Sequence, residues 1–283
     1  MNHWEYKKPE EIKPFSLHIE VIADYGGRHS PDPAFSEVRN HFLRFDTGGK
    51  LGWITETAVA GFSTIETGFW IAQIGLHSEH PNLVIFSNTA PRGKIAWTGE
   101  HTQPFVCGLL DNGIPLFTVN AGFNLSFVKD RLQGLWEVLV PNTGTQFRSR
   151  DQYPEATMAI LNGDTNRIGK AIDLSTIPSV PGNRVASIDG YGNVKTTIRA
   201  SQVTDQLHQA SRLRVTINGK THDAVNELSG QSAKDGELKI GVGSSGGKND
   251  PFIEIVRIMG SARKDFDLDA PRDDLDPIIL EAI

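Results

Sequence analysis

Apolar and polar positions in the first half of the chain repeat at two spacings, that of strands and that of helices. The runs 18–23 (HIEVIA) and 83–87 (LVIFS) are short and apolar, as in strands at the centre of a sheet. Helical spacing begins after Asp32-Pro33, an N-cap followed by proline, and again at the capping box 63–66. Further strands are expected at 94–98, 105–110 and 135–140. This alternation predicts an α/β domain with a largely parallel central sheet.

The second half of the chain has the pattern of an all-β domain. Its apolar runs are short and are separated by turn residues, among which Asn218-Gly219 is a strong hairpin signal. The expected strands are 183–188, 194–199, 212–217, 237–242 and 252–258. The segment DLSTIPSVPG before them contains two prolines and a glycine, as linkers do. We therefore expect an N-terminal α/β domain of residues 1–172 and a smaller, β-barrel-like domain of residues 183–283.

Composition and charge narrow the classes of function. The 283 residues are 38% apolar and 22% charged, as in globular proteins, and the net charge of −6 provides no basic surface for nucleic acid. No apolar run reaches the roughly 18 residues that a membrane-spanning helix needs. The single cysteine, Cys107, suits a reducing cytoplasm, and its apolar neighbours predict a core thiol rather than a nucleophile. We expect a cytoplasmic protein with no nucleic-acid or membrane partner.

Polar residues gather where predicted strands end, and ligands of open α/β sheets bind beyond the carboxyl ends of the strands. Three such groups are 24–27 (DYGG), 88–92 (NTAPR) and 111–113 (DNG). A carboxylate in this position can accept both hydroxyls of a ribose, while glycines let a flat ring approach the backbone. The alternative is that each group only turns the chain, which is the common role of a segment such as 111–113.

Two other segments have both a structural and a chemical interpretation. Residues 147–151 (FRSRD) form either a site with two guanidiniums, a hydroxyl and a carboxylate, or a solvated charge run with internal Arg150–Asp151 pairing. Residues 189–193 (DGYGN) either only turn the chain between two strands or also hold a ligand. The nine histidines lack metal-ligand spacing and acidic or cysteine partners, so we expect no metal site.

In this order, the segments resemble motifs of the superfamily of S-adenosyl-L-methionine hydroxide adenosyltransferases, which includes the nucleophilic fluorinases and chlorinases. IDGYGNVKTTI is similar to the family's I-D-x-F-G-N-x-x-T-N-I, and VIADYGG to L-x-T-D-F-G. LLDNGI resembles P-D-N-G-L, and QFRSRD resembles T-F-H-G-R-D or T-F-Y-S-R-E. FIEIVRIMGSA is similar to the C-terminal segment that closes over the adenine and amino-acid end. The resemblance extends from about Ile19 to Phe266.

The resemblance implies a nucleoside site with residues from both domains. Asp24 would hold the ribose hydroxyls, and Asp32 would approach the methionine ammonium. Asp189 and Asn193 would form the C-terminal domain's face of the site, with Asn193 directed at the amino-acid part. The remaining binding positions implied are Asp111, Asn112, Phe147, Ser245 (or Ser244) and Arg257. The resemblance also implies a homotrimer with its sites at the subunit interfaces, and no cofactor beyond S-adenosyl-L-methionine as substrate.

The sequence departs from the family at the positions that activate water. Asn88 stands where hydroxide-transferring members have Asp, Arg92 matches the Arg position, and Arg148 stands at the His position. Asparagine and arginine cannot accept a proton at neutral pH. Ser149 matches the serine of fluorinase-like members. Together with Arg148, it could replace the hydration shell of an anionic nucleophile and align it for in-line attack.

We therefore expect an enzyme in which hydroxide or halide attacks the ribose 5′ carbon of S-adenosyl-L-methionine. The products would be L-methionine and adenosine or a 5′-substituted deoxyadenosine. The first alternative is a non-catalytic homologue that binds adenosylmethionine or adenosine and has lost the water-activating Asp and His. A second alternative is an enzyme that acts on a different nucleoside.

Overall fold

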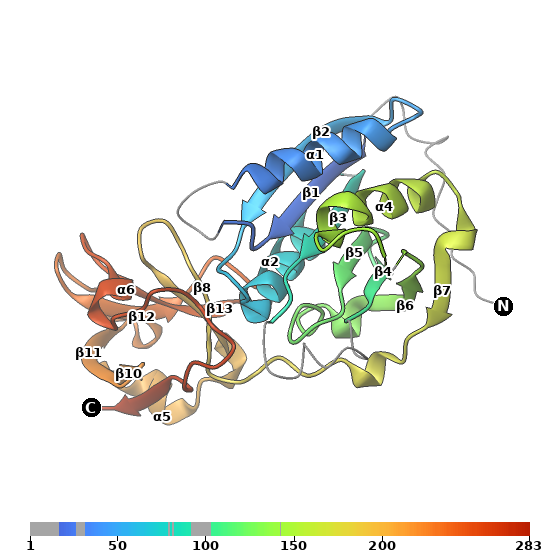
Figure 1. Cartoon of the computed structure of the whole chain (residues 1–283). Coiled ribbons are helices and arrows are strands. Elements are labelled where there is room, and N and C mark those ends of the chain that lie inside the picture. Colours follow the sequence, from blue (N-terminus) through green and yellow to red (C-terminus); the bar gives the residue numbers. More distant parts are fainter. Residues whose placement is uncertain (1–16, 27–31, 79, 81, 92–102, 142) are drawn as a thin grey trace. The chain divides into compact units, whose positions relative to one another are not determined.

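The structure is a computed structural model that describes residues 17–26, 32–78, 80, 82–91, 103–141 and 143–283 (Figure 1). The chain divides into two compact units, Met1–Ser179 and Val180–Ile283. The division lies within residues 173–182, the segment that has the composition of a linker. Each unit contains one seven-stranded sheet. Among the described residues, no helix has both the length and the apolar character needed to cross a lipid bilayer.

The sheet of the first unit is mixed, with the strand order β2-β1-β3-β5-β4-β6-β7. Its strands are β1 (Leu17–Ala23), β2 (Leu51–Ala58), β3 (Leu83–Asn88), β4 (Phe105–Leu110), β5 (Pro115–Val119), β6 (Leu132–Val138) and β7 (Ile168–Ala171). Three strand pairings are parallel and three are antiparallel, so a largely parallel sheet is not confirmed. The reason is the short connection between β4 and β5, since a tight turn can join only antiparallel neighbours. The strand expected at 94–98 lies outside the described residues.

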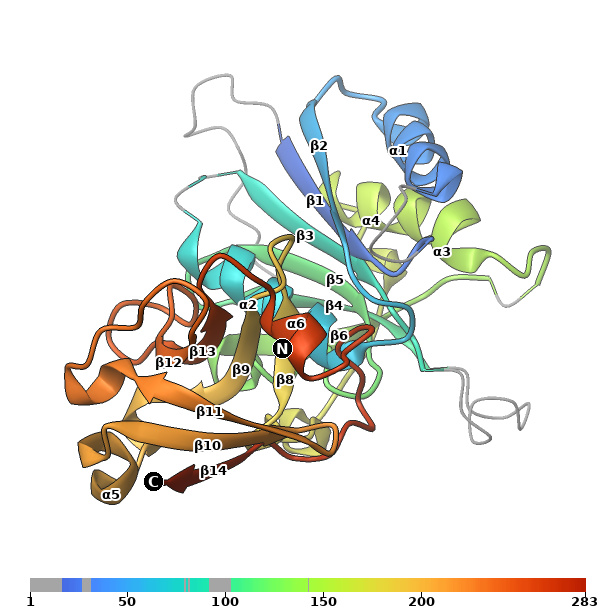
Figure 2. The ribbon, with the colours of Figure 1, turned by 90° about the vertical axis from the view of Figure 1, so that its left-hand side faces the viewer.

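Helices cover both faces of this sheet (Figure 2). They are α1 (Pro33–Phe45), α2 (Thr64–His77), α3 (Arg148–Asp151) and α4 (Tyr153–Leu161), with 3-10 turns η2 (Lys129–Arg131), η3 (Thr165–Arg167) and η4 (Leu174–Thr176). The expected caps of α1 and α2 are confirmed, because Asp32 accepts the N–H of Ala34 at 2.8 Å and Ser63 accepts that of Glu66 at 3.3 Å. On the α1 side, the core includes Phe42 and Phe86, whose ring centroids lie 5.0 Å apart. Cys107 belongs to the same core, where burial raises the pKa of its thiol to about 12.

The sheet of the second unit has the strand order β14-β10-β11-β12-β13-β9-β8. Its strands are β8 (Val185–Ile188), β9 (Val194–Arg199), β10 (Arg212–Ile217), β11 (Lys220–Asn226), β12 (Leu238–Val242), β13 (Phe252–Arg257) and β14 (Ile279–Ala282). The helical segments are η5 (Ala200–Gln202), α5 (Asp205–Gln209), η6 (Glu227–Ser229) and α6 (Ala262–Asp265). All pairings are antiparallel except β11 with β12. The sheet curls, but the described residues of β14 and β8 do not pair, which makes it a half-barrel rather than a closed barrel (Figure 2).

The hairpin between β10 and β11 follows directly from its sequence. Asn218 has φ 50° and Gly219 has φ 70°, so both turn residues are left-handed, as the favoured two-residue hairpin loop requires. The side-chain amide of Asn218 also donates to the carbonyl of Asp267 at 3.0 Å. The predicted hairpin is therefore confirmed, and its turn is tied to the segment that follows α6.

Candidate functional site

The parallel strands of the first unit bring three separate segments together around Asp24. Ala23 is level with Ala58 of β2 and with Asn88 of β3, so the carboxyl ends of these strands coincide. The backbone N–H of Asp24 donates to the Asn88 carbonyl at 3.4 Å. Carboxylate oxygen Oδ2 of Asp24 accepts the N–H of Phe62 at 2.9 Å. We call this group the Asp24 edge and define it by Asp24, Phe62 and Asn88.

Phe62 is a member of this edge that the sequence pattern did not indicate. Its φ is 62°, a left-handed conformation that non-glycine residues avoid and that costs about 1–3 kcal/mol. Glu66 stabilises the loop before Phe62, since its buried carboxylate accepts the N–H of Ala60 at 2.8 Å. Glu66 was expected only as part of a helix cap. Here the capping residue also shapes the loop that presents Phe62 to Asp24.

Aromatic side chains and Ser149 lie against Tyr25, the residue that follows Asp24. The ring of Tyr25 is buried and meets Phe35 and Phe147 edge to face, with centroids 5.1 and 5.6 Å away. Burial raises the pKa of the Tyr25 hydroxyl, and the nearby Ser149 side chain opposes that rise. No described residue reaches this hydroxyl with the geometry of a full hydrogen bond. Through these contacts with Tyr25 we add Phe147 and the buried Ser149 to the Asp24 edge.

The two arginines of the 147–151 segment are engaged elsewhere. The Arg150 guanidinium donates to Asp151 at 2.6 Å and to Glu37 at 3.0 Å, and it lies 4.9 Å from the ring centroid of Phe147. This pairing lowers the pKa of Asp151 to about 2. Arg148 lies over the ring of Tyr153, at 5.9 Å. Internal Arg150–Asp151 pairing, one of the two interpretations of this segment, is what the structure shows.

Asp111 and Asn112 lie at the opposite ends of the strands from Asp24. Their turn precedes β5, which runs parallel to β3, and therefore lies at the amino ends of the parallel strands. Asp111 pairs with Arg131, with Nη2 and Oδ1 2.9 Å apart, and Asn112 donates to the Gly75 carbonyl at 2.8 Å. The expectation that these residues share a site with Asp24 is therefore corrected. Because β4 runs antiparallel, its carboxyl end lies at the amino ends of the parallel strands. Here the turn interpretation holds.

Asp32 and Arg92 are the remaining residues that the resemblance implied in the first unit. The carboxylate of Asp32 is the N-cap of α1. This contact gives the side chain a structural role. Arg92 lies outside the described residues.

In the second unit, Asp189 organises its own turn. Its Oδ1 accepts the N–H of Tyr191 at 2.9 Å and that of Asn193 at 3.0 Å, while Oδ2 accepts the side-chain amide of Asn193 at 2.9 Å. Gly192 has φ 88°, and a Cβ there would lie 2.0 Å from Oγ of Ser261. The Gly192 carbonyl also accepts the N–H of Arg263 at 2.9 Å. The turn is thus joined to the segment after β13.

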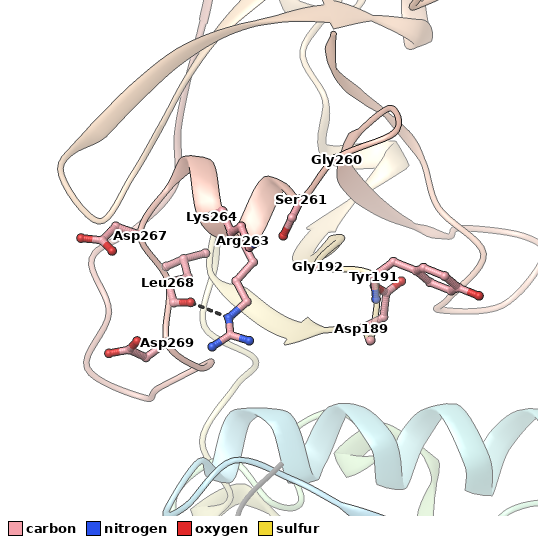
Figure 3. Close-up of a pocket in the computed structure, with 11 residues that line it drawn as sticks. Asp189, Tyr191, Gly192, Gly260, Ser261, Arg263, Lys264, Asp267, Leu268 and Asp269 are labelled. Carbon is pink, nitrogen blue, oxygen red and sulfur yellow. Dashed lines mark hydrogen bonds between the residues drawn. The ribbon is translucent and has the colours of Figure 1, made fainter. Parts of the chain in front are cut away.

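A cavity of about 780 Å³ opens between these two segments (Figure 3). Both segments carry motifs of the resemblance: the turn of IDGYGNVKTTI and the end of FIEIVRIMGSA. The Tyr191 side chain at its rim is 83% exposed. The lining residues are Asp189, Gly190, Tyr191, Gly192, Gly260, Ser261, Arg263, Lys264, Asp267, Leu268 and Asp269. We call this cavity the Asp189 pocket.

The other implied residues of the second unit bind protein groups and do not line the Asp189 pocket. Arg257 donates to Asp265 at 2.7 Å and to the Gly236 carbonyl at 2.8 Å. Ser245 is buried, and its hydroxyl donates to Glu254 at 3.2 Å. The same Glu254 oxygen pairs with Lys195 at 2.7 Å and accepts the N–H of the alternative residue, Ser244, at 3.2 Å.

The described residues contain no group of three or more His, Cys, Asp or Glu side chains that could hold a metal ion. The polar side chains of the Asp24 edge and the Asp189 pocket provide carboxylate, hydroxyl, amide, ammonium and guanidinium groups. At the Asp24 edge, one carboxylate and two buried hydroxyls lie among aromatic rings. Such a setting can hold a polar ring such as ribose and can exclude water from a small anion.

No protein-family model and no curated protein matches this sequence. Solved structures do share its fold. An uncharacterized conserved protein from Thermotoga maritima has a TM-score of 0.68 at 16% identity, with 93% of this chain and 100% of that chain covered. A conserved hypothetical protein from Thermus thermophilus has a TM-score of 0.61 at 14% identity, with 94% and 100% covered. At these identities the likeness shows the fold alone.

Proposed function

We propose that this protein is an S-adenosyl-L-methionine-dependent adenosyltransferase-like enzyme. In the proposed reaction, an anionic nucleophile, hydroxide or halide, attacks the ribose 5′ carbon. The products are L-methionine and adenosine or a 5′-substituted deoxyadenosine. The observation that carries the proposal is the Asp24 edge, where Asp24, Asn88 and the Phe147–Ser149 segment meet although they are far apart in sequence. Asp24 and the Phe147–Ser149 segment belong to motifs of the resemblance, and Asn88 stands at the position where hydroxide-transferring members have Asp.

Asp24 would bind the ribose. A carboxylate can accept two neighbouring hydroxyls, and hydrogen bonds to a charged acceptor are among the strong ones. The Phe62 N–H, 2.9 Å from Oδ2, holds the plane of the carboxylate. The left-handed conformation of Phe62 is consistent with a functional role, because strained backbone often occurs at ligand sites.

The main requirement of the reaction is a nucleophilic anion that has lost its hydration shell. A lone pair of the anion forms the new bond to the 5′ carbon, and the electrons of the carbon–sulfur bond pass to sulfur. Sulfur leaves as a neutral thioether, so no general acid is needed. The anion must instead lose its hydration shell. The hydroxyls of Ser149 and Tyr25, buried beside Phe35 and Phe147, can provide donors in a dry surrounding. Arg148, which lies over Tyr153, has the smaller part in this proposal.

One observation favours a second candidate, a binding protein without turnover. Asn88 and Arg148 stand where the hydroxide-transferring relatives have a proton-accepting Asp and His, and neither can accept a proton at neutral pH. The ligand would be the same, and only the chemical step would be missing. The two candidates therefore differ in one measurable quantity, the release of methionine.

The test is methionine release from S-adenosyl-L-methionine in fluoride, chloride, bromide and halide-free buffer. We expect release by the wild type in at least one buffer, and a kcat lower by about 100-fold in Ser149→Ala, the size of effect seen when one preorganised donor is removed. Ser126→Ala is the matched control, since Ser126 is an equally buried serine of the same unit. No release in any buffer, together with a thermal shift on adding ligand, would leave the binding protein as the function.

A further inference from the structure

The carboxylate of an amino-acid ligand needs a cationic or donor partner, and the partners implied by the resemblance are occupied. The Arg257 guanidinium is paired with Asp265 at 2.7 Å. The Ser245 hydroxyl faces the carboxylate of Glu254 at 3.2 Å. A ligand carboxylate placed beside Ser245 would have to compete with the Glu254 carboxylate for the Ser245 hydroxyl and for the ammonium of Lys195, which is paired with Glu254 at 2.7 Å. Another residue of the second unit is therefore better suited to the task.

Arg263 points into the Asp189 pocket from α6 (Figure 3). Its backbone N–H is bound to the Gly192 carbonyl at 2.9 Å, and its Nε donates to the Leu268 carbonyl at 2.8 Å. These two bonds fix the backbone of Arg263 and the Nε atom of its guanidinium. In the part of the chain that the structure describes, the terminal nitrogens Nη1 and Nη2 have no hydrogen-bond or ion-pair partner. The guanidinium is thus held in place, while Nη1 and Nη2 can still donate two parallel hydrogen bonds. This is the geometry with which arginine binds carboxylates.

Exposed carboxylates of the pocket are suitable partners for the ammonium group of an amino acid. Asp267 and Asp269 are exposed on the far side of Arg263 from the Asp189 turn (Figure 3). Both Asp189 oxygens accept N–H groups of their own turn, and these dipoles offset part of the negative charge of this carboxylate. A ligand with one carboxylate and one ammonium would meet Arg263 with the first group and an exposed aspartate with the second. A purely anionic ligand would meet Arg263 and the exposed Lys264 but would also face the two exposed aspartates, whose charge a ligand ammonium would offset.

We propose that Arg263 binds the carboxylate of the amino-acid end of the ligand, and that the Asp189 pocket selects ligands that carry an α-amino-acid group. The inference rests on the proposed function for the identity of the whole ligand, S-adenosyl-L-methionine. It differs from the family resemblance in the residue that performs the task. Arg263 is a specificity-determining residue here and takes no part in the bond changes at the ribose carbon.

The experiment compares three ligands by titration calorimetry: S-adenosyl-L-methionine, its decarboxylated analogue and adenosine. The wild type should bind adenosylmethionine at least about 10-fold more tightly than the decarboxylated analogue, as expected for charge-assisted bonds to a carboxylate. Arg263→Gln should abolish this preference and leave the affinity for adenosine within about 2-fold. The matched control is Arg272→Gln, since Arg272 is 60% exposed in its side chain, pairs with Asp274 at 3.2 Å and does not line the pocket.

The outcomes separate the two proposals. If adenosylmethionine binds but Arg263→Gln keeps the wild-type preference, or if the wild type has none, the inference is wrong and the proposed function stands. If neither adenosine nor adenosylmethionine binds to the wild type, both are wrong. Arg263→Lys guards against misfolding of the glutamine variant. It keeps the charge without the planar fork, and its preference should lie between those of wild type and Arg263→Gln.

Discussion

Two short segments of similar composition, 24–26 (DYG) and 189–192 (DGYG), each follow a strand and begin with aspartate. In the first, the carboxylate accepts the N–H of Phe62, a residue from a different loop, and the tyrosine ring is buried. In the second, the carboxylate accepts three N–H groups of its own turn, and the tyrosine ring is 83% exposed. The same residue types therefore serve different purposes in the two units.

The difference lies in what holds each carboxylate. Asp189 closes its turn by bonds within five residues, so its position depends little on the rest of the chain. Asp24 is placed by the register of three parallel strands and by the loop that Glu66 supports. We therefore expect Asp189 to act chiefly as a structural residue beside its pocket and Asp24 to bind the ligand. Three substitutions test this distinction.

The largest effect is expected for Asp24→Ala on adenosine affinity. If the carboxylate accepts two ribose hydroxyls, its removal loses two charge-assisted bonds worth roughly 1.5–3 kcal/mol each. The dissociation constant measured by calorimetry should rise by at least about 100-fold. Asp164→Ala is the control, because it removes an exposed carboxylate that likewise accepts a backbone N–H, that of Asn166 at 3.1 Å. Equal affinities of Asp24→Ala and wild type would show that the ribose assignment is wrong.

The next effect concerns the joint between the Asp189 turn and the segment after β13. Gly192→Ala puts a Cβ 2.0 Å from Oγ of Ser261 at a φ of 88°. Left-handed strain of about 1–2 kcal/mol and overpacking of about 1–3 kcal/mol should together lower the free energy of unfolding by about 2–5 kcal/mol in denaturant titrations. Gly190→Ala, with no atom within 4 Å of the added Cβ, should stay within about 0.5 kcal/mol of wild type. Similar stabilities of the two variants would mean that the turn is not joined to Ser261 as described.

The smallest effect is expected for Asp189→Ala. The lost turn bonds resemble those of a helix cap, and their loss should lower the free energy of unfolding by about 1–2 kcal/mol. Asp189→Asn keeps one acceptor oxygen and should lose about half as much. Adenosine affinity, measured on the same samples, should change less than in Asp24→Ala. A loss of affinity as large as that of Asp24→Ala would abolish the distinction between the two aspartates.

The sequence by itself determined the features that depend on neighbouring residues. The N-cap Asp32, the Ser63 cap of α2, the Asn218-Gly219 hairpin and the buried Cys107 all occur as predicted. Each of them is decided within a few residues, by a side chain that bonds to the nearby backbone or by a backbone angle that a residue type prefers. Local bonding also occurs in two segments for which the sequence allowed a structural interpretation: Arg150 pairs with Asp151, and Asp189 closes the turn 189–193.

Only the tertiary structure decided which of these features share a site. The antiparallel course of β4 places Asp111 and Asn112 away from Asp24, although all three residues follow strands. The approach of Phe62 to Asp24 and the open guanidinium of Arg263 depend on contacts between distant segments. Strand order, strand direction and the pairing of charges across such contacts follow from which distant surfaces pack together. A local pattern of residues does not determine which distant surfaces pack together, because the same turn or arginine can contact many different partners.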